Sequence, residues 1–344
     1  MKDRMIAVAF IAIAALLNVG SIASAQNDPH RLGTSGSGFA AGLAKPQQQL
    51  TIPLTALYTS ASYGTGGVAL RNRSKGDIHI SGVTGPTQAA WLYWAVLFNS
   101  PTAAQLKAAA EVTLQREYPT GVSASAQIHG TLLAIGGDPC WGSQGTWVYR
   151  GAVPTSLATG NGIYRVIIGS KAVGLSDGED PWDGNLVFPL WEGASLVIIG
   201  TGGASVGLLD GQAGTTFATT TLSNYYTLPA PVAAGSQVLL DNIGYDGQVG
   251  DSRTIFSGPG FSATNETTYV SGFPSDISVF LAGQGGETGN SDWDGSSGWP
   301  LPQLWDDTGH DISNAFAAGD NLVLVSYTST YDCIGTVAAV VSVQ

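Results

Sequence analysis

The chain has 344 residues, of which 44% are hydrophobic, and a formal net charge of −12 at pH 7. The charge is uneven: residues 26–176 hold ten Lys and Arg against five Asp and Glu, whereas residues 177–344 hold nineteen Asp and Glu against one basic residue, Arg253. So acidic a half repels nucleic acid phosphates and anionic lipid, which argues against a nucleic-acid-binding protein.

The first 25 residues contain the three parts of a signal peptide in the expected order. A charged start precedes an apolar run over residues 6–17, and Ala23-Ser24-Ala25 forms a small-x-small cleavage site. The run is shorter than the about 20 apolar residues that a membrane helix needs. We therefore expect export, a mature chain that begins at Gln26 and has no membrane span, and a location outside the cell, on its surface or in the periplasm.

Residues 26–49 are rich in Gly, Ser, Ala and Gln, which predicts a flexible leader. From Leu50 onward, short runs rich in Val, Ile, Thr, Leu and Tyr alternate with clusters of Gly, Asn, Asp and Pro. Expected strands cover residues 76–83, 88–98, 111–116, 126–135, 146–149, 162–168, 194–199, 215–228, 237–242, 277–282, 321–328 and 335–343. One Ala-rich stretch, residues 102–111, favours a short helix. Many short strands separated by turns indicate an all-β sandwich or barrel.

A pattern in the middle of the chain returns near its end. Residues 153–166 and 312–325 each run from an apolar residue through a polar turn and a Gly into a strand. We therefore expect two tandem antiparallel β-sandwich domains of jelly-roll type, at residues 50–215 and 216–344, the second of them acidic. Chance similarity between Gly-rich strands is the alternative.

Several segments together resemble an uncharacterised β-rich module of bacterial and archaeal surface proteins, which accompanies adhesin-like or fimbrial modules. The segments that carry the resemblance are Ala90-Trp91-Leu92-Tyr93-Trp94, residues 153–166, Gly193–Ile199, Gly207–Gly211 and Trp305–Val325. The resemblance implies an extracellular or surface β-sandwich and leaves its molecular activity open. The chain departs from the associated modules in showing no recognisable isopeptide-type arrangement of Lys, Asn and Glu.

The chain has two cysteines, Cys140 and Cys333. In an exported protein they are candidates for one disulfide, although the sequence does not show that they lie close together. There is no CxxC motif or Cys/His cluster, so zinc-finger and redox-motif interpretations have no support.

Two acidic segments are candidates for calcium binding. The stretch Asn290-Ser291-Asp292-Trp293-Asp294-Gly295 alternates oxygen-bearing side chains and ends in Gly, like the first half of a calcium loop. Leu301 stands at the twelfth position, so this is not an EF-hand. A related acidic stretch contains Asp177, Glu179 and Asp183. The bland alternative for both is a solvated acidic turn.

The same loops carry tryptophans that suit a glycan-binding surface, because an exposed indole plane stacks on the C–H faces of a sugar ring. The candidate ligand-binding residues are Trp182, Trp293 and Trp299, with burial at the end of a sandwich as the alternative. For Trp91 and Trp94, which lie inside an expected strand, the core interpretation is favoured.

No catalytic residue is assigned. The stretch Gly203–Gly207 fits the GxSxG pattern around Ser205, but its flanks indicate two strands and a hairpin turn rather than strand, elbow and helix. His310 beside acidic residues suits a metal, but an acidic turn before a strand is more common. We therefore expect a secreted or cell-surface β-sandwich protein with a non-catalytic adhesive, binding or structural role toward a glycan or surface protein. The alternative is a secreted carbohydrate-active protein, either a glycan-binding module or a glycan-cleaving enzyme.

Overall fold

The structure is a computed structural model, and it describes residues 50–52, 54–71, 73–118, 124–137, 142–169, 188–210, 215–217, 221–245, 266–281, 305–329 and 333–344. The strands are β1 (Leu50–Ile52), β2 (Ala56–Ala69), β3 (Lys75–Ile80), β4 (Thr87–Phe98), β5 (Glu111–Glu117), β6 (Ala124–His129), β7 (Thr131–Gly136), β8 (Gly145–Ala152), β9 (Gly162–Ile168), β10 (Leu190–Thr201), β11 (Ala204–Asp210), β12 (Thr215–Phe217), β13 (Thr221–Thr227), β14 (Val238–Tyr245), β15 (Glu266–Phe273), β16 (Ile277–Leu281), β17 (Trp305–Asp311), β18 (Leu322–Ser329) and β19 (Cys333–Val343). The helices are α1 (Ala103–Ala109) and the 3-10 turn η2 (Ser313–Ala315). Neither of these two could cross a membrane, being too short for it.

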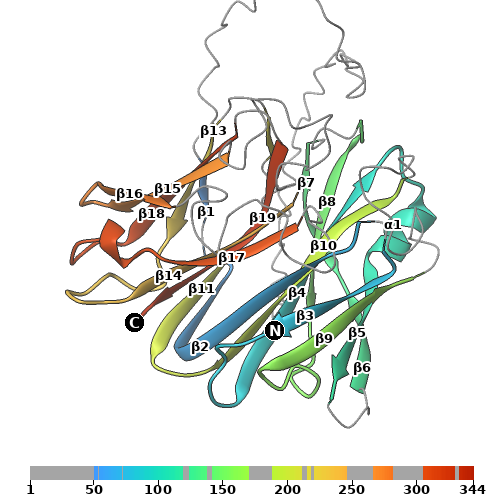
Figure 1. Cartoon of the computed structure of the whole chain (residues 1–344), viewed down its shortest axis with the longest axis horizontal. Helices are drawn as coiled ribbons and strands as arrows, with labels where there is room; N and C mark the ends of the chain where they lie inside the picture. Colours follow the sequence, from blue (N-terminus) through green and yellow to red (C-terminus); the bar gives the residue numbers. More distant parts are fainter. Residues whose placement is uncertain are drawn as a thin grey trace, which may run out of the picture. The chain divides into compact units, whose positions relative to one another are not determined.

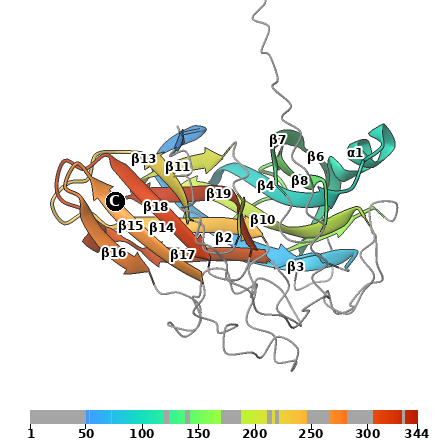
Figure 2. The same cartoon turned by 90° about the horizontal axis from the view of Figure 1, so that it is seen from above.

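The described strands form three mostly antiparallel sheets, which confirms the all-β expectation. The central sheet has the order β17-β14-β19-β11-β2-β10-β4-β8-β7, with β12 beside β19. The first outer sheet is β3-β9-β5-β6, and the second outer sheet is β1-β13-β18-β15-β16. The β1–β13 pair is parallel. Figures 1 and 2 show the second outer sheet over β14 and β19 and the first outer sheet over β4 and β10.

The strand order repeats between the first half of the chain (β2 to β10) and the second half (β11 to β19). In the central sheet, β8-β4-β10-β2 of the first half corresponds to β17-β14-β19-β11 of the second. In the outer sheets, β3-β9-β5-β6 corresponds to β13-β18-β15-β16. The halves meet where β2 pairs with β11. The two echoing segments, residues 153–166 and 312–325, both lead from the central sheet into an outer sheet, from β8 to β9 and from β17 to β18.

Strand β10 of the central sheet is buried on both faces. In β10, Leu196 and Ile198 face the first outer sheet, whereas Val197 and Ile199 face a middle core shared with strands of the second half. β17 packs against β2 and β10, so the central sheet bends around this middle core. Burial on both faces explains the continuous apolar sequence of β10. The same packing also places polar residues of the first half opposite polar residues of the second half.

The expected helix is confirmed. Thr102 caps α1, and its hydroxyl accepts a hydrogen bond from the Gln105 amide at 3.2 Å. The Gln105 side chain accepts one in return from the Thr102 amide at 2.9 Å. This reciprocal capping box satisfies backbone donors that the first turn leaves without partners.

Two local expectations are wrong. Residues 126–135 are not one strand, because the chain passes from β6 in the first outer sheet to β7 in the central sheet at Gly130. A Cβ at Gly130 would lie 2.4 Å from the Trp94 ring, so this crossing packs tightly on the core. His310 does not lie in an acidic turn but in β17.

Candidate functional site

The predicted loop residues lie outside the described residues. These are the calcium candidates Asn290, Asp292, Asp294, Asp177, Glu179 and Asp183, the tryptophans Trp182, Trp293 and Trp299, and Cys140. Cys333 begins β19, but its side chain is also outside the described part. The calcium, glycan and disulfide expectations therefore stay predictions.

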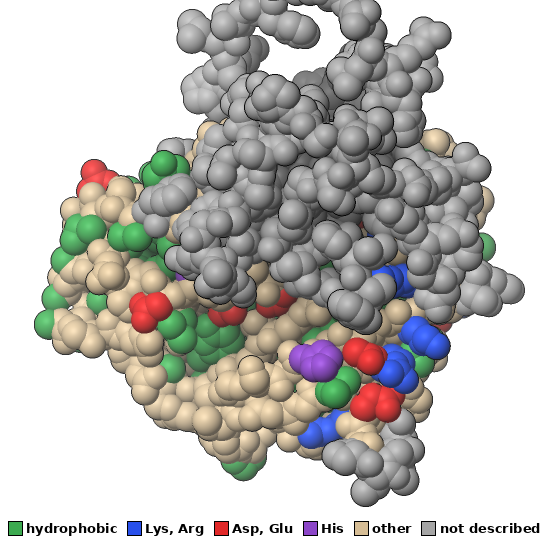
Figure 3. Space-filling view, viewed as in Figure 1, with side chains coloured by type: hydrophobic (Ala, Val, Ile, Leu, Met, Phe, Trp, Pro, Cys, Tyr) green, Lys and Arg blue, Asp and Glu red, His purple; other side chains and the backbone are tan. Residues whose placement is uncertain are grey.

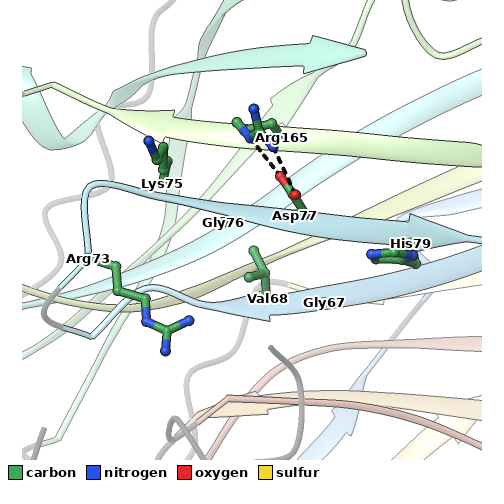
Figure 4. Close-up of a pocket in the computed structure, with 8 residues that line it drawn as sticks. All are labelled: Gly67, Val68, Arg73, Lys75, Gly76, Asp77, His79 and Arg165. Carbon is green, nitrogen blue, oxygen red and sulfur yellow. Dashed lines mark hydrogen bonds and ion pairs between the residues drawn. The ribbon is translucent and has the colours of Figure 1, made fainter. Parts of the chain in front are cut away.

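The described residues contain a hollow of about 510 Å³ beside β3. It is lined by Gly67, Val68, Arg73, Lys75, Gly76, Asp77, His79 and Arg165. Figure 4 shows Arg165 and Asp77 joined across β9 and β3, with Lys75 next to the pair and Arg73 on the other side of the β3 ribbon. We call this feature the basic pocket, because three cationic side chains line it against one carboxylate.

Glycines bring β2 and β3 together at this pocket. A Cβ at Gly66 would lie 2.4 Å from the backbone oxygen of His79, and a Cβ at Gly76 would lie 2.4 Å from a methyl group of Val68. Only glycine allows backbones to approach this closely. Arg73 lies in the turn between the two strands, where its amide donates to the Leu70 carbonyl at 3.0 Å, and Lys75 is the first residue of β3.

Arg165 is held in place by two carboxylates. Its Nε and Nη2 donate to the two oxygens of Asp77 at 2.7 and 2.9 Å. Its Nη1 lies 3.1 Å from Oε1 of Glu117. The hydrogen bond with Asp77 raises the pKa of Arg165 above its ordinary value, although burial opposes the charge. Lys75 is exposed, and no ion pair joins it to any other residue that the structure describes.

The pocket therefore suits an anion. Arg165 is oriented by its partners, Lys75 is open to solvent, and Arg73 is buried at the pocket wall. Figure 3 shows charged and His side chains gathered on the lower right of the face seen there, the region of β3 and β9 in Figure 1. Sequence reasoning missed this site. The available signal was three basic residues within five positions, Arg71, Arg73 and Lys75, in a chain with few basic residues.

A second group of polar residues lies on the middle core around Asp210. Its Oδ2 accepts hydrogen bonds from Arg150 Nη1 at 2.6 Å and from the Tyr93 hydroxyl at 2.8 Å, and its Oδ1 accepts one from Thr55 at 2.7 Å. The Arg150 guanidinium also stacks over the ring of Trp91 at 4.8 Å. The charge of Asp210 is thus balanced inside the protein, which indicates a structural role.

A third group of polar residues contains two carboxylates, and we call it the carboxylate pair. Asp241 accepts hydrogen bonds from the Tyr63 hydroxyl and, at 3.0 Å, from the Thr65 hydroxyl. Burial raises the pKa of Asp307 to about 7; the nearby Ser195 and Thr65 hydroxyls lower it, and the charge of Asp241 raises it. The carboxylate pair lies between β2 and β10 of the first half and β14 and β17 of the second.

Three further residues that the sequence singles out, Trp91, Trp94 and Ser205, lie within strands. Trp94 is fully buried, as expected, and its indole N–H donates to the Ala109 carbonyl at 2.8 Å. Trp91 is only partly buried, and its N–H donates to the Tyr58 hydroxyl at 2.9 Å. Ser205 lies in β11 directly after the β10–β11 turn, so the expected strand-turn-strand context of this serine is confirmed.

No protein-family model matches the chain, and no curated protein matches it. Among solved structures, it is similar to the infectious bursal disease virus VP2 subviral particle, with 8% identity over 87% of this chain and 74% of that chain and a TM-score of 0.24. It is also similar to the CUB1-EGF-CUB2 domain of human MASP-1/3, with 10% identity over 81% of this chain and 99% of that chain and a TM-score of 0.16. At these TM-scores neither likeness bears on the function of this chain.

Proposed function

We propose that the chain is an exported, non-catalytic binding protein that uses the basic pocket to hold an acidic group of an extracellular glycan or surface partner. The observation that carries the proposal is the pocket lining, which contains three cationic side chains, Arg73, Lys75 and Arg165, and a single carboxylate, Asp77. The pocket is a cationic hollow in the basic first half of a chain whose net charge is −12. Carboxylate and sulfate groups are matched by arginine and lysine donors through charge-assisted hydrogen bonds.

We further propose that the scaffold consists of two tandem jelly rolls. A jelly roll is an eight-stranded double sheet, and the common strand order of the two halves supports this reading. The shared middle core supports a stiff connection between the two units, because both faces of β10 are packed. A stiff scaffold keeps the basic pocket in one shape, which lowers the entropy cost of binding.

The test is a binding screen with the mature chain, residues 26–344, on a glycan array and in polysaccharide pull-downs. We expect retention on glycans that carry uronic acid or sulfate groups and little retention on neutral glycans. Binding should weaken as sodium chloride is raised, since salt screens exposed charges. Lys75→Glu should weaken binding about tenfold, which corresponds to about 1.4 kcal/mol.

Lys107→Glu is the matched control, because Lys107 is an exposed lysine on α1 away from the pocket. Equal loss of binding in both variants would indicate a general charge effect and refute the pocket. Binding to neutral glycans that Lys75→Glu leaves unchanged would instead favour the carbohydrate-active alternative based on Trp182, Trp293 and Trp299.

Export is tested separately. The proposal expects secreted material whose amino-terminal sequence begins at Gln26, and it expects a version without residues 1–25 to stay inside the cell. Secreted protein that begins at Met1 would contradict cleavage. This outcome is independent of the binding screen.

A further inference from the structure

Buried carboxylates on the central sheet differ in how their charge is balanced. Asp210 is paired with Arg150, and Glu192 with Arg71. Asp307 has no such partner: within the described ranges no Arg, Lys or His forms an ion pair with it, and neither of its buried oxygens accepts a hydrogen bond of normal geometry. An uncompensated buried carboxylate is costly. Something else must therefore neutralise the charge at this position.

Asp241 lies next to Asp307 on the same face. In the β14–β17 pair, Asp241 is opposite Gly309 and Asp307 is opposite Ile243, so the two aspartates are diagonal neighbours. The two glycines nearby leave space for them. A Cβ at Gly309 would lie 2.5 Å from Oδ1 of Asp241, and one at Gly67 would lie 2.9 Å from Cβ of Asp307.

Hydroxyl groups of the first half surround the carboxylate pair. Those of Tyr63 and Thr65 contact the Asp241 carboxylate. The Ser195 hydroxyl accepts a hydrogen bond from the Trp305 indole at 3.0 Å, and its oxygen would lie 3.0 Å from a Cβ at Gly67. The chemistry that gathers here is oxygen from carboxylates and hydroxyls, the donor set that hard cations prefer.

We propose that Asp241 and Asp307 bind a hard divalent cation of the calcium class between them. No group of three or more His, Cys, Asp or Glu side chains in the described ranges is placed to share a metal. Hydroxyls and water would therefore complete the shell. Two carboxylates and three hydroxyls offer up to seven oxygens, within the about 6–8 that calcium takes. This site is distinct from the predicted loops at residues 177–183 and 290–295.

The cation would join the two halves of the chain. Asp241 and Asp307 belong to β14 and β17, whereas the hydroxyl groups come from β2 and β10. Binding at this seam neutralises repulsion between the carboxylates and adds contacts between the halves. Because a cation that binds only the folded chain stabilises it by mass action, stability should rise with calcium concentration.

The experiment measures thermal unfolding of the mature chain in calcium chloride, in chelator and in sodium chloride of matched ionic strength. Terbium titration gives direct binding, since Tyr63 and Trp305 adjoin the site and sensitise terbium luminescence. We expect a calcium-specific rise in the unfolding temperature. We also expect Asp307→Asn to weaken terbium binding at least tenfold.

The effect of Asp307→Asn on stability should depend on whether calcium is present. In chelator, Asp307→Asn should be at least as stable as the wild type, because it removes one of two repelling charges, while in calcium it should be less stable. A purely structural role for Asp307 would lower stability in both conditions. Asp311→Asn, an exposed change on the same strand, should keep the full calcium response.

Three results would overturn the proposal. One is a calcium response that Asp307→Asn retains but Asp292→Ala/Asp294→Ala loses, which would put the cation in that loop. Another is an equal response to sodium and calcium. The third is no response in the wild type together with no terbium binding, which would mean that a proton neutralises the carboxylate pair.

Discussion

Gly193 of β10 lies directly against the indole of Trp305 of β17. A Cβ at Gly193 would lie 2.4 Å from Cγ and Cδ2 of Trp305. Trp305 is fully buried, so its ring has little freedom to move away. This contact joins the first and second halves of the chain through the middle core.

Gly193→Ala should destabilise the protein by about 1–3 kcal/mol, the usual cost of overpacking a core. The measurement is urea unfolding followed by tryptophan fluorescence. Gly203→Ala is the control, because a Cβ there would meet only the flexible end of Gln344, at 3.5 Å. Equal stability of the two variants would show that the middle core is not tightly packed.

The Arg150–Asp210 ion pair should contribute far more to stability than the Arg165–Asp77 pair. The side chain of Asp210 is 2% exposed and that of Asp77 is 38% exposed. Removing one partner of a buried pair costs about 3–5 kcal/mol, and partial exposure of Arg150 puts Asp210→Asn near the lower end. Asp77→Asn should cost about 1 kcal/mol or less.

A double-mutant cycle with Arg150→Met and Asp210→Asn measures the coupling itself. We expect a coupling energy above about 1 kcal/mol, since the partners share one hydrogen-bond network with Tyr93. Additive effects of the two substitutions would contradict the network.

The helix cap can be tested in the same way. Thr102→Ala should cost about 1 kcal/mol, because it removes the hydroxyl that accepts from the Gln105 amide. The substitution should also affect packing of the core, because Ala109 of α1 is fully buried. Thr102→Ser keeps the acceptor and should restore most of the stability in chemical unfolding, whereas equal losses in the two variants would rule out capping as the cause.

The sequence predicted strands that are rich in apolar residues, such as β4, β9 and β19. It did not predict β17, because the sequence Trp305–Asp311 has one large apolar residue and three Asp. That strand is stable because Trp305 is packed in the middle core and its polar residues meet partners on β2 and β14. Such partners are distant in sequence, so no local pattern reveals them.

The basic pocket and the carboxylate pair were also not predicted from the sequence. Both depend on glycines that let strands approach, Gly66 and Gly76 at the pocket and Gly67 and Gly309 at the carboxylates. In the sequence these residues look like ordinary turn or strand glycines. The structural role of each glycine depends on which strand lies opposite it, and the order of strands in the sheet determines that neighbour.

Because of Asp320, the free energy of unfolding should decrease at acidic pH. Burial opposes its charge, but hydrogen bonds from Ser275 and from the Ala317 amide outweigh burial and lower the pKa of Asp320 below its ordinary 3.8. The Ser275 amide lies 2.8 Å from Oδ1 and the Ala317 amide 2.9 Å from Oδ2. A group whose pKa is lowered by folding contributes stability above its unfolded pKa and loses it as pH falls through the folded pKa.

Asp320→Asn should therefore cost about 1.5–3 kcal/mol at neutral pH, the range for hydrogen bonds to charged groups. The gap between wild type and variant should stay constant down to about pH 4, near the ordinary Asp pKa, and narrow below it. Urea unfolding at a series of pH values measures the gap. Asp276→Asn is the control, because Asp276 is exposed and Asn tolerates its positive φ of 56°. If the stability difference between wild type and Asp320→Asn stays the same from neutral pH to pH 2, the charged Asp320 carboxylate is not what accepts the hydrogen bonds from Ser275 and Ala317.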